Sequence, residues 1–160
     1  MTFLLVLGAY LVILFLLGFF SRRNLGVASL TLAAGALLAE LWTDSLTPIV
    51  AEAGVIVVQP PLSSLVAVAL TLIPALLVMV RSPKAAHHAH TAISSIIFAV
   101  LGVMLTYSAF TNAVVLDAAS AQYVAEVMNY DAIIITAAIV AAVGEVLFHK
   151  KRAHYDRHKK

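Results

Sequence analysis

The chain has 160 residues, of which 62% are hydrophobic and 11% charged, with a formal net charge of +2 and no cysteine. Soluble domains are closer to half apolar and a quarter charged, so a soluble fold could not cover this much apolar surface, and we expect lipid as the surrounding solvent. The lack of cysteine excludes a disulfide framework, a thiolate metal site and a cysteine nucleophile.

Five segments are apolar and long enough to cross a bilayer as helices, which takes roughly 20 residues each. The expected spans are 2–20, 25–42, 62–80, 93–111 and 132–148, followed by a basic cytoplasmic tail at 149–160. Two of the spans carry a charge, Glu40 in the second and Glu145 in the fifth. The sequence therefore predicts an all-α, polytopic membrane bundle of five transmembrane helices.

The basic residues are distributed unevenly between the two ends of these spans. All ten lysines and arginines follow the first, third or fifth span, and the loops after the second and fourth spans carry only acidic charges. The positive-inside rule then predicts an N-terminus outside and a C-terminus in the cytoplasm of a multi-pass bacterial inner-membrane protein. The first span lacks the basic n-region and the A-x-A site of a cleaved signal peptide, so we expect it to remain as a helix.

Both outer loops contain the pattern of a short amphipathic helix lying at the membrane interface. In the first loop Thr47 fits an N-cap, Pro48 the first helical position and Gly54 a stop. In the second loop, Asp117 fits a cap and is followed by polar residues that recur on one face at helical spacing.

The two carboxylates within the spans are candidates for a polar pathway, because buried charge in lipid is costly. Glu40 lies about a turn from the outer end of the second span, so its carboxylate either reaches the headgroups or lines a cavity or proton path. Glu145 lies near the inner end of the fifth span, where it either pairs along the helix with His149 and Lys150 or takes part in a relay. Since the two lie near opposite membrane faces, we do not expect them to form one two-carboxylate site.

Several residues suggest how the helices pack. Pro74 within the third span removes a backbone donor and predicts a kink. The fifth span pairs small residues as Ala137 with Ala141, or Ala138 with Ala142. The fourth span carries a stripe of small residues at 4-3-4 spacing: Ser95, Ala99, Gly102 and Thr106. Such stripes let helices approach closely, so we predict that the fourth and fifth spans pack as a pair or form a seam for another copy or subunit.

The basic residues are candidates for contact with anionic lipid headgroups or a partner on the cytoplasmic side: Arg22, Arg23, Lys150, Lys151 and Arg152. The tail has one tyrosine and no groove-reading element, so we do not expect nucleic acid as a partner. His154 and His158 have a zinc-compatible spacing, but no cysteine and no firm carboxylate ligand accompanies them, so we predict no metal site.

Motifs of catalysis are missing from the sequence. It contains no Ser-His-Asp arrangement, Gly-rich phosphate loop, HExxH or pair of membrane-embedded aspartates. We therefore expect neither an enzyme nor a cofactor.

The first third of the chain resembles a known family. Residues 5–50 contain, in order, an apolar helix ending in Gly-Phe, one or two arginines, a nearby glycine, a small-residue-rich second helix and an acidic loop with proline. This arrangement is similar to the colicin V production protein (CvpA) family. The resemblance implies an accessory bacterial inner-membrane protein linked to secretion or envelope maintenance. It also implies that Gly18, Arg22, Arg23 and Gly26 form a tight turn that contacts lipid or a partner.

Two functions fit these observations. The first is a non-enzymatic accessory or scaffold protein that works in an oligomer with itself or other membrane subunits. The alternative is a small transporter or channel subunit that uses Glu40 or Glu145 in a polar pathway. A transporter should present one of these carboxylates to a cavity between helices, whereas a scaffold should bury only small and apolar residues at its seams.

Overall fold

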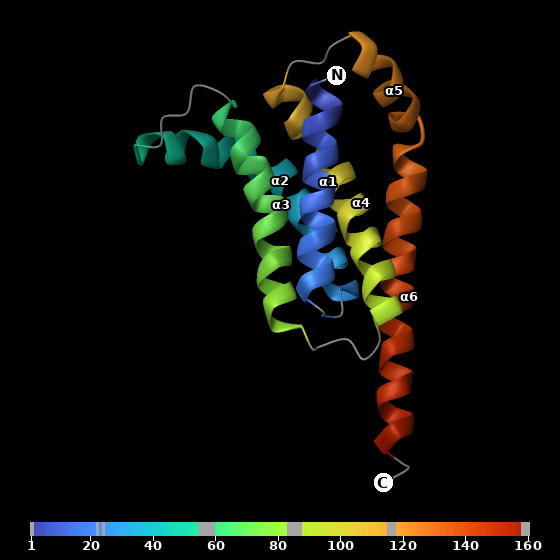
Figure 1. Cartoon of the computed structure of the whole chain (residues 1–160). Coiled ribbons are helices and arrows are strands. Elements are labelled where there is room, and N and C mark those ends of the chain that lie inside the picture. Colours follow the sequence, from blue (N-terminus) through green and yellow to red (C-terminus); the bar gives the residue numbers. More distant parts are fainter. Residues whose placement is uncertain are drawn as a thin grey trace.

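Helices make up the regular structure of the described part of the chain (Figure 1). The computed structural model describes residues 2–21, 23, 25–54, 60–82, 88–114 and 118–157, without the side chains of 88–90, 118–120 and 148–157. The helices are α1 (Thr2–Ser21), α2 (Gly26–Glu52), α3 (Leu62–Arg81), α4 (His88–Ala113), α5 (Ala118–Met128) and α6 (Asp131–Arg157).

The helices α1 to α4 are each long and apolar enough to cross a membrane. A fifth span is added when α5 and α6 are taken together, and these two helices meet at an angle of 56°. The predicted all-α bundle of membrane-spanning helices is therefore confirmed.

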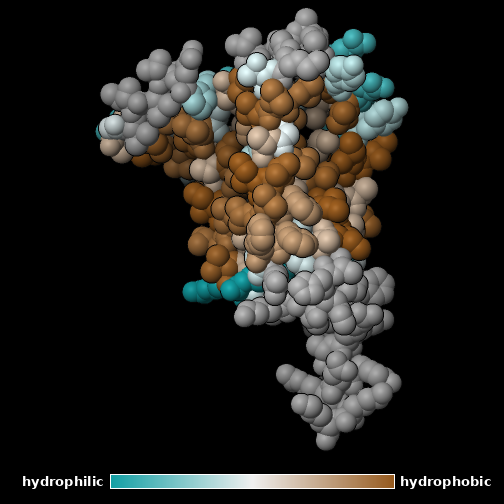
Figure 2. All heavy atoms as spheres, in the orientation of Figure 1, coloured by the Kyte–Doolittle hydropathy of each residue, from teal (hydrophilic) through white to brown (hydrophobic). Residues whose placement is uncertain are grey.

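The bundle has an apolar outer surface between two polar ends. Figure 2 shows a broad hydrophobic band with hydrophilic residues at either end of it. Leu5, Leu77 and Val140 are 72%, 64% and 63% exposed, which suits contact with lipid chains rather than water. The N-terminus and the C-terminus lie at opposite ends of the bundle (Figure 1), as an odd number of spans requires.

Helix α4 lies at the centre of the packing and contacts α1, α2, α3 and α6. Its Phe98 and Leu101 are fully buried. They belong to one core cluster with Leu14 of α1, Leu32 of α2 and Met79 of α3 among its members. The core therefore forms around a single central helix, and α1 remains largely exposed on its outer side.

Helix α2 is longer than the predicted span 25–42, because it continues without a break to Glu52. The prediction of a separate interfacial helix after Thr47 is wrong. The Thr47 hydroxyl donates to the Thr43 carbonyl at 2.6 Å inside α2 instead of capping a new helix.

Pro48 lies within α2, where the carbonyl that loses its donor belongs to the exposed Asp44. The predicted stop at Gly54 is confirmed, with a φ of +90° just beyond the helix end. The last part of α2 extends away from the other helices (Figure 1).

The predicted short helix after α4 is present as α5. Val124 is buried, whereas Tyr123 and Glu126 are exposed. The predicted cap Asp117 lies outside the described residues.

The backbones of helices α2 and α3 approach each other closely at Gly35. A Cβ atom there would lie 2.6 Å from the Thr71 carbonyl oxygen and 2.9 Å from the Leu70 carbonyl oxygen, so only glycine fits. Pro74 has no N–H, and the Leu70 carbonyl therefore lacks its donor four residues ahead in α3. The close approach thus falls on the part of α3 where the hydrogen-bond ladder is interrupted.

Candidate functional site

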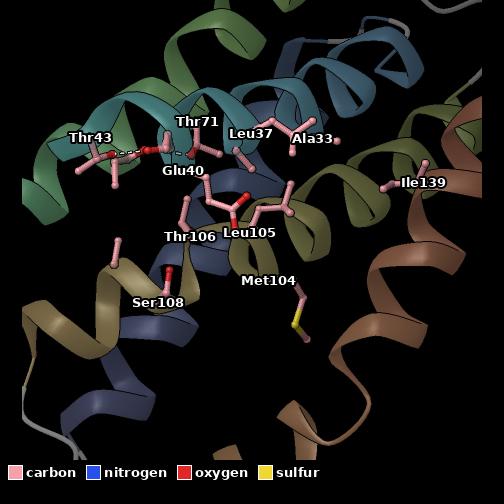
Figure 3. Close-up of a pocket in the computed structure, with 14 residues that line it drawn as sticks. Ala33, Leu37, Glu40, Thr43, Thr71, Met104, Leu105, Thr106, Ser108 and Ile139 are labelled. Carbon is pink, nitrogen blue, oxygen red and sulfur yellow. Dashed lines mark hydrogen bonds between the residues drawn. The ribbon is translucent and has the colours of Figure 1, made fainter. Parts of the chain in front are cut away.

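A cavity of about 550 Å³ lies between α2, α3 and α4, with α6 at its edge (Figure 3). The lining side chains that carry oxygen atoms are Glu40, Thr43, Thr71, Thr106 and Ser108. The remaining lining residues are alanines and larger apolar side chains, namely Ala33, Ala36, Leu37, Ala39, Ala67, Met104, Leu105, Ala109 and Ile139. The cavity is therefore a mostly apolar space with one carboxylate, and no lysine, arginine or histidine lines it among the described residues.

Glu40 lies deeper in its helix than the sequence predicted. Because α2 continues to Glu52, about three further turns follow Glu40 instead of one. Its side chain reaches from α2 toward α4, where Thr106 and Leu105 form the facing wall (Figure 3). Within the described part of the chain, no hydrogen bond or ion pair holds this carboxylate. Glu40 thus lines a cavity, as one of the two interpretations predicted, and it is exposed there on the isolated chain. Contact of its carboxylate with headgroups stays a prediction.

The threonine hydroxyls around Glu40 have their protons committed elsewhere. Thr43, Thr71 and Thr106 each donate to the carbonyl four residues earlier in their own helix, at 2.6, 2.9 and 2.7 Å. A hydroxyl has one proton and two lone pairs, so these groups are left to act as acceptors. The Thr106 hydroxyl oxygen also lies within hydrogen-bonding distance of the Tyr10 hydroxyl of α1, at 3.2 Å.

Glu145 has a different environment, at the beginning of α2. The Ser94 hydroxyl of α4 donates to its Oε1 at 2.6 Å. Its Cβ lies 3.4 Å from the position that a Cβ on Gly26 would take, so α6 packs directly on the first residue of α2. The N-cap residue Leu25 supplies no side-chain hydrogen bond, and a carboxylate near this helix start is favourable for the free N–H groups there.

Glu145 therefore joins three helices and plays a structural part. The side chains of His149 and Lys150, its predicted partners along the helix, lie outside the described residues. Glu40 is fourteen residues beyond Gly26 along α2, about 21 Å at 1.5 Å per residue. The two carboxylates thus belong to separate sites, and Glu145 does not line the cavity.

Arg23 binds the end of α3. Its Nη1 donates to the Ser82 carbonyl at 2.8 Å and also to the Val80 carbonyl. A cation at a helix C-terminus satisfies carbonyls that have no partner within the helix. The sequence did not indicate this contact, because nothing in residues 21–25 shows which helix ends beside them. Arg22 and the side chains of Lys150, Lys151 and Arg152 lie outside those described.

The small-residue stripe of α4 is buried against α1. A Cβ on Gly18 would lie 3.0 Å from the Ser95 hydroxyl oxygen, and a Cβ on Gly102 would lie 2.7 Å from Leu14 Cδ1. The other stripe residues, Ala99 and Thr106, are also buried. Helix α4 does contact α6, where Ala138 and Ala142 are the buried pair. The stripe itself, however, is occupied within the chain, so the predicted seam for another copy is wrong for this face.

The described residues contain no group of three or more histidine, cysteine, aspartate or glutamate side chains that could hold a metal ion. The side chains of His154 and His158 lie outside this part of the chain.

Comparisons with known proteins identify no relative. No protein-family model, curated protein or solved structure matches the chain. The similarity to the colicin V production family stays a prediction, and the functional interpretation rests on the geometry.

Proposed function

We propose that this chain is a small, non-enzymatic transport or channel subunit that binds a proton or another monovalent cation at Glu40. The observation that carries the proposal is the position of this carboxylate in a cavity between membrane-spanning helices. An ionised carboxylate between membrane-spanning helices is costly unless it is hydrated or paired. Exchange between a protonated carboxyl and a cation-bound carboxylate is the elementary step of a cation pathway.

No lysine or arginine of the chain is expected close enough to Glu40 to pair with its carboxylate. All ten lysines and arginines lie outside the expected spans, and the cavity lining contains none. Among the described residues, the lining therefore supplies no counter-charge to Glu40.

The interrupted part of α3 lies next to the cavity. Leu70 lacks its intrahelical donor, and Gly35 packs on this interrupted part of α3. Helices bend most readily where the hydrogen-bond ladder is broken by proline. Thr71, which lines the cavity, follows directly after Leu70, so bending here would alter the cavity wall.

Reconstitution of the purified chain into liposomes tests the proposal. A gradient of H⁺, Na⁺ or K⁺ is imposed in turn, and the flux is followed with ion-sensitive dyes. We expect the wild type to dissipate at least one gradient and Glu40→Gln to do so at least tenfold more slowly. Glu52→Gln is the matched control, because Glu52 ends α2 away from the cavity and its loss should leave the flux unchanged. Equal rates for wild type and Glu40→Gln, or no flux above empty liposomes, would contradict the proposal.

The second candidate is an accessory or scaffold subunit, as the similarity to the colicin V production family implies. One observation favours it: the cavity is not enclosed, and Glu40 is exposed on the isolated chain, so a neighbouring subunit could cover both. Native mass spectrometry of the detergent-extracted complex would reveal such a subunit. A stable hetero-complex without any Glu40-dependent flux would favour this candidate. Both candidates place the chain in the bacterial inner membrane, with the N-terminus outside and anionic lipid at the cytoplasmic end.

A further inference from the structure

The cavity around Glu40 has the size and walls of a small-molecule site. Its volume of about 550 Å³ falls within the roughly 300–1,000 Å³ of ligand pockets. A proton or a bare metal ion would leave most of this space empty. Leu37, Met104 and Ile139 contribute hydrocarbon to the lining, so the space suits a ligand with an apolar body.

The polar atoms of the lining accept hydrogen bonds but offer few in return. Thr43, Thr71 and Thr106 direct their protons to backbone carbonyls, and an ionised Glu40 has none to give. Among the described lining side chains, this leaves the Ser108 hydroxyl as the group with a proton to offer. An anion or a neutral carbonyl compound would find few donors here. A cation that carries N–H groups would bond to the carboxylate and to hydroxyl lone pairs at once, and such charge-assisted bonds are strong.

The same lining argues against two other classes of cation. Divalent metal ions such as Ca²⁺ take six to eight oxygen ligands, usually with several carboxylates, whereas Glu40 is the one carboxylate among the described lining residues. Quaternary ammonium ions are recognised by cages of aromatic rings, and no described residue of the lining is aromatic.

We infer that the cavity binds a small primary or secondary organic ammonium ion, with its charged nitrogen on Glu40 and its apolar body against α4 and α6. This inference rests on the proposed function and names the ligand class of the same site. The ligand nitrogen loses its hydration and instead donates hydrogen bonds to Glu40 and to the threonine hydroxyl oxygens, while the hydrocarbon of the ligand leaves water.

Equilibrium dialysis of the full chain in detergent against radiolabelled n-hexylamine, which is an ammonium ion at pH 7, tests the inference. Protein-free micelles give the background. We expect saturable binding to the wild type and to the control Glu52→Gln, and at least tenfold weaker binding to Glu40→Gln, because a charged hydrogen bond is lost. Thr43→Val removes one acceptor with little change of shape and should weaken binding severalfold. Tetraethylammonium, which has no N–H, and neutral 1-hexanol should each compete at least tenfold more weakly than unlabelled hexylamine.

Each outcome decides a separate point. Equal binding to wild type and Glu40→Gln overturns the inference, provided that both elute alike on a sizing column and have the same helix content by circular dichroism. If Glu40→Gln is misfolded, unchanged binding to a folded Thr43→Val overturns it instead. Equal competition by tetraethylammonium overturns the requirement for N–H donors. Glu40-dependent flux of an inorganic cation without any hexylamine binding removes this ligand class and leaves the proposed function in place. Hexylamine binding at Glu40 without any flux supports this ligand class and contradicts the proposed transport function.

Discussion

Replacing Gly35 by alanine tests how tightly α2 and α3 are held together. The new Cβ would lie 2.6 Å from the Thr71 carbonyl oxygen, whereas ordinary van der Waals contact begins at 3.4 Å. The helices would have to separate by about 0.8 Å (3.4 minus 2.6) at this point. The atoms it meets on Thr71 and Leu70 belong to the backbone, so no side-chain rotation relieves the clash.

The expected loss of stability follows from two opposing effects. Overpacking in a close-packed interior costs about 1–3 kcal/mol. Replacing glycine by alanine within a helix gains about 0.5–1 kcal/mol. Gly35→Ala should therefore lower the free energy of unfolding by about 0–2.5 kcal/mol overall. Gly144→Ala in α6 is the matched control, because a Cβ there meets nothing within 4 Å and only the gain remains.

The free energy of unfolding is measured by titrating the protein in mixed micelles with a denaturing detergent, followed by circular dichroism. The free energy of unfolding of Gly35→Ala should be about 1–3 kcal/mol lower than that of Gly144→Ala, because both variants gain the same helix propensity from alanine. Equal stability of the two variants would refute the close approach at Gly35.

Two further predictions concern the ends of the helices. Arg23→Ala should lower the free energy of unfolding by about 1–3 kcal/mol in the same titration, because α3 loses a charged donor at its C-terminus. An Arg23→Ala variant as stable as the wild type would show that the contact contributes nothing. For topology, a single cysteine in place of Glu52 or Asn129 should react with an impermeant maleimide in intact cells, whereas one at Ala85 or Ala153 should react only after permeabilisation. The reverse labelling pattern would contradict the positive-inside argument.

The spans were predictable because each needs only a long apolar run, and α1 and α3 begin and end within one residue of the expected limits. The depth of Glu40 was not predictable from the same pattern. The polar residues after Trp42 and the proline at 48 are typical of a loop, and hydropathy alone therefore ended the helix too early. The helix continues because Thr43 and Thr47 satisfy their hydroxyls within it and the carbonyl left free by Pro48 is exposed.

The sequence also did not indicate which helix packs against each of these surfaces. The stripe with Gly102 indicates that some helix approaches closely, but any helix with a suitable face would satisfy it. The structure selects α1, because Gly18 supplies a matching gap opposite Ser95. Likewise, a carboxylate such as Glu145 has many possible partners along its own helix, and the one observed, Ser94, is 51 positions away.

The contact of Arg23 with the end of α3 has a consequence for how the chain is made. Its carbonyl partners, Val80 and Ser82, lie 57 and 59 positions later in the chain. Arg23 is therefore synthesised well before these carbonyls, and the contact forms only after the whole of α3 has been made. The junction between α1 and α2 cannot be fixed to the end of α3 until that point.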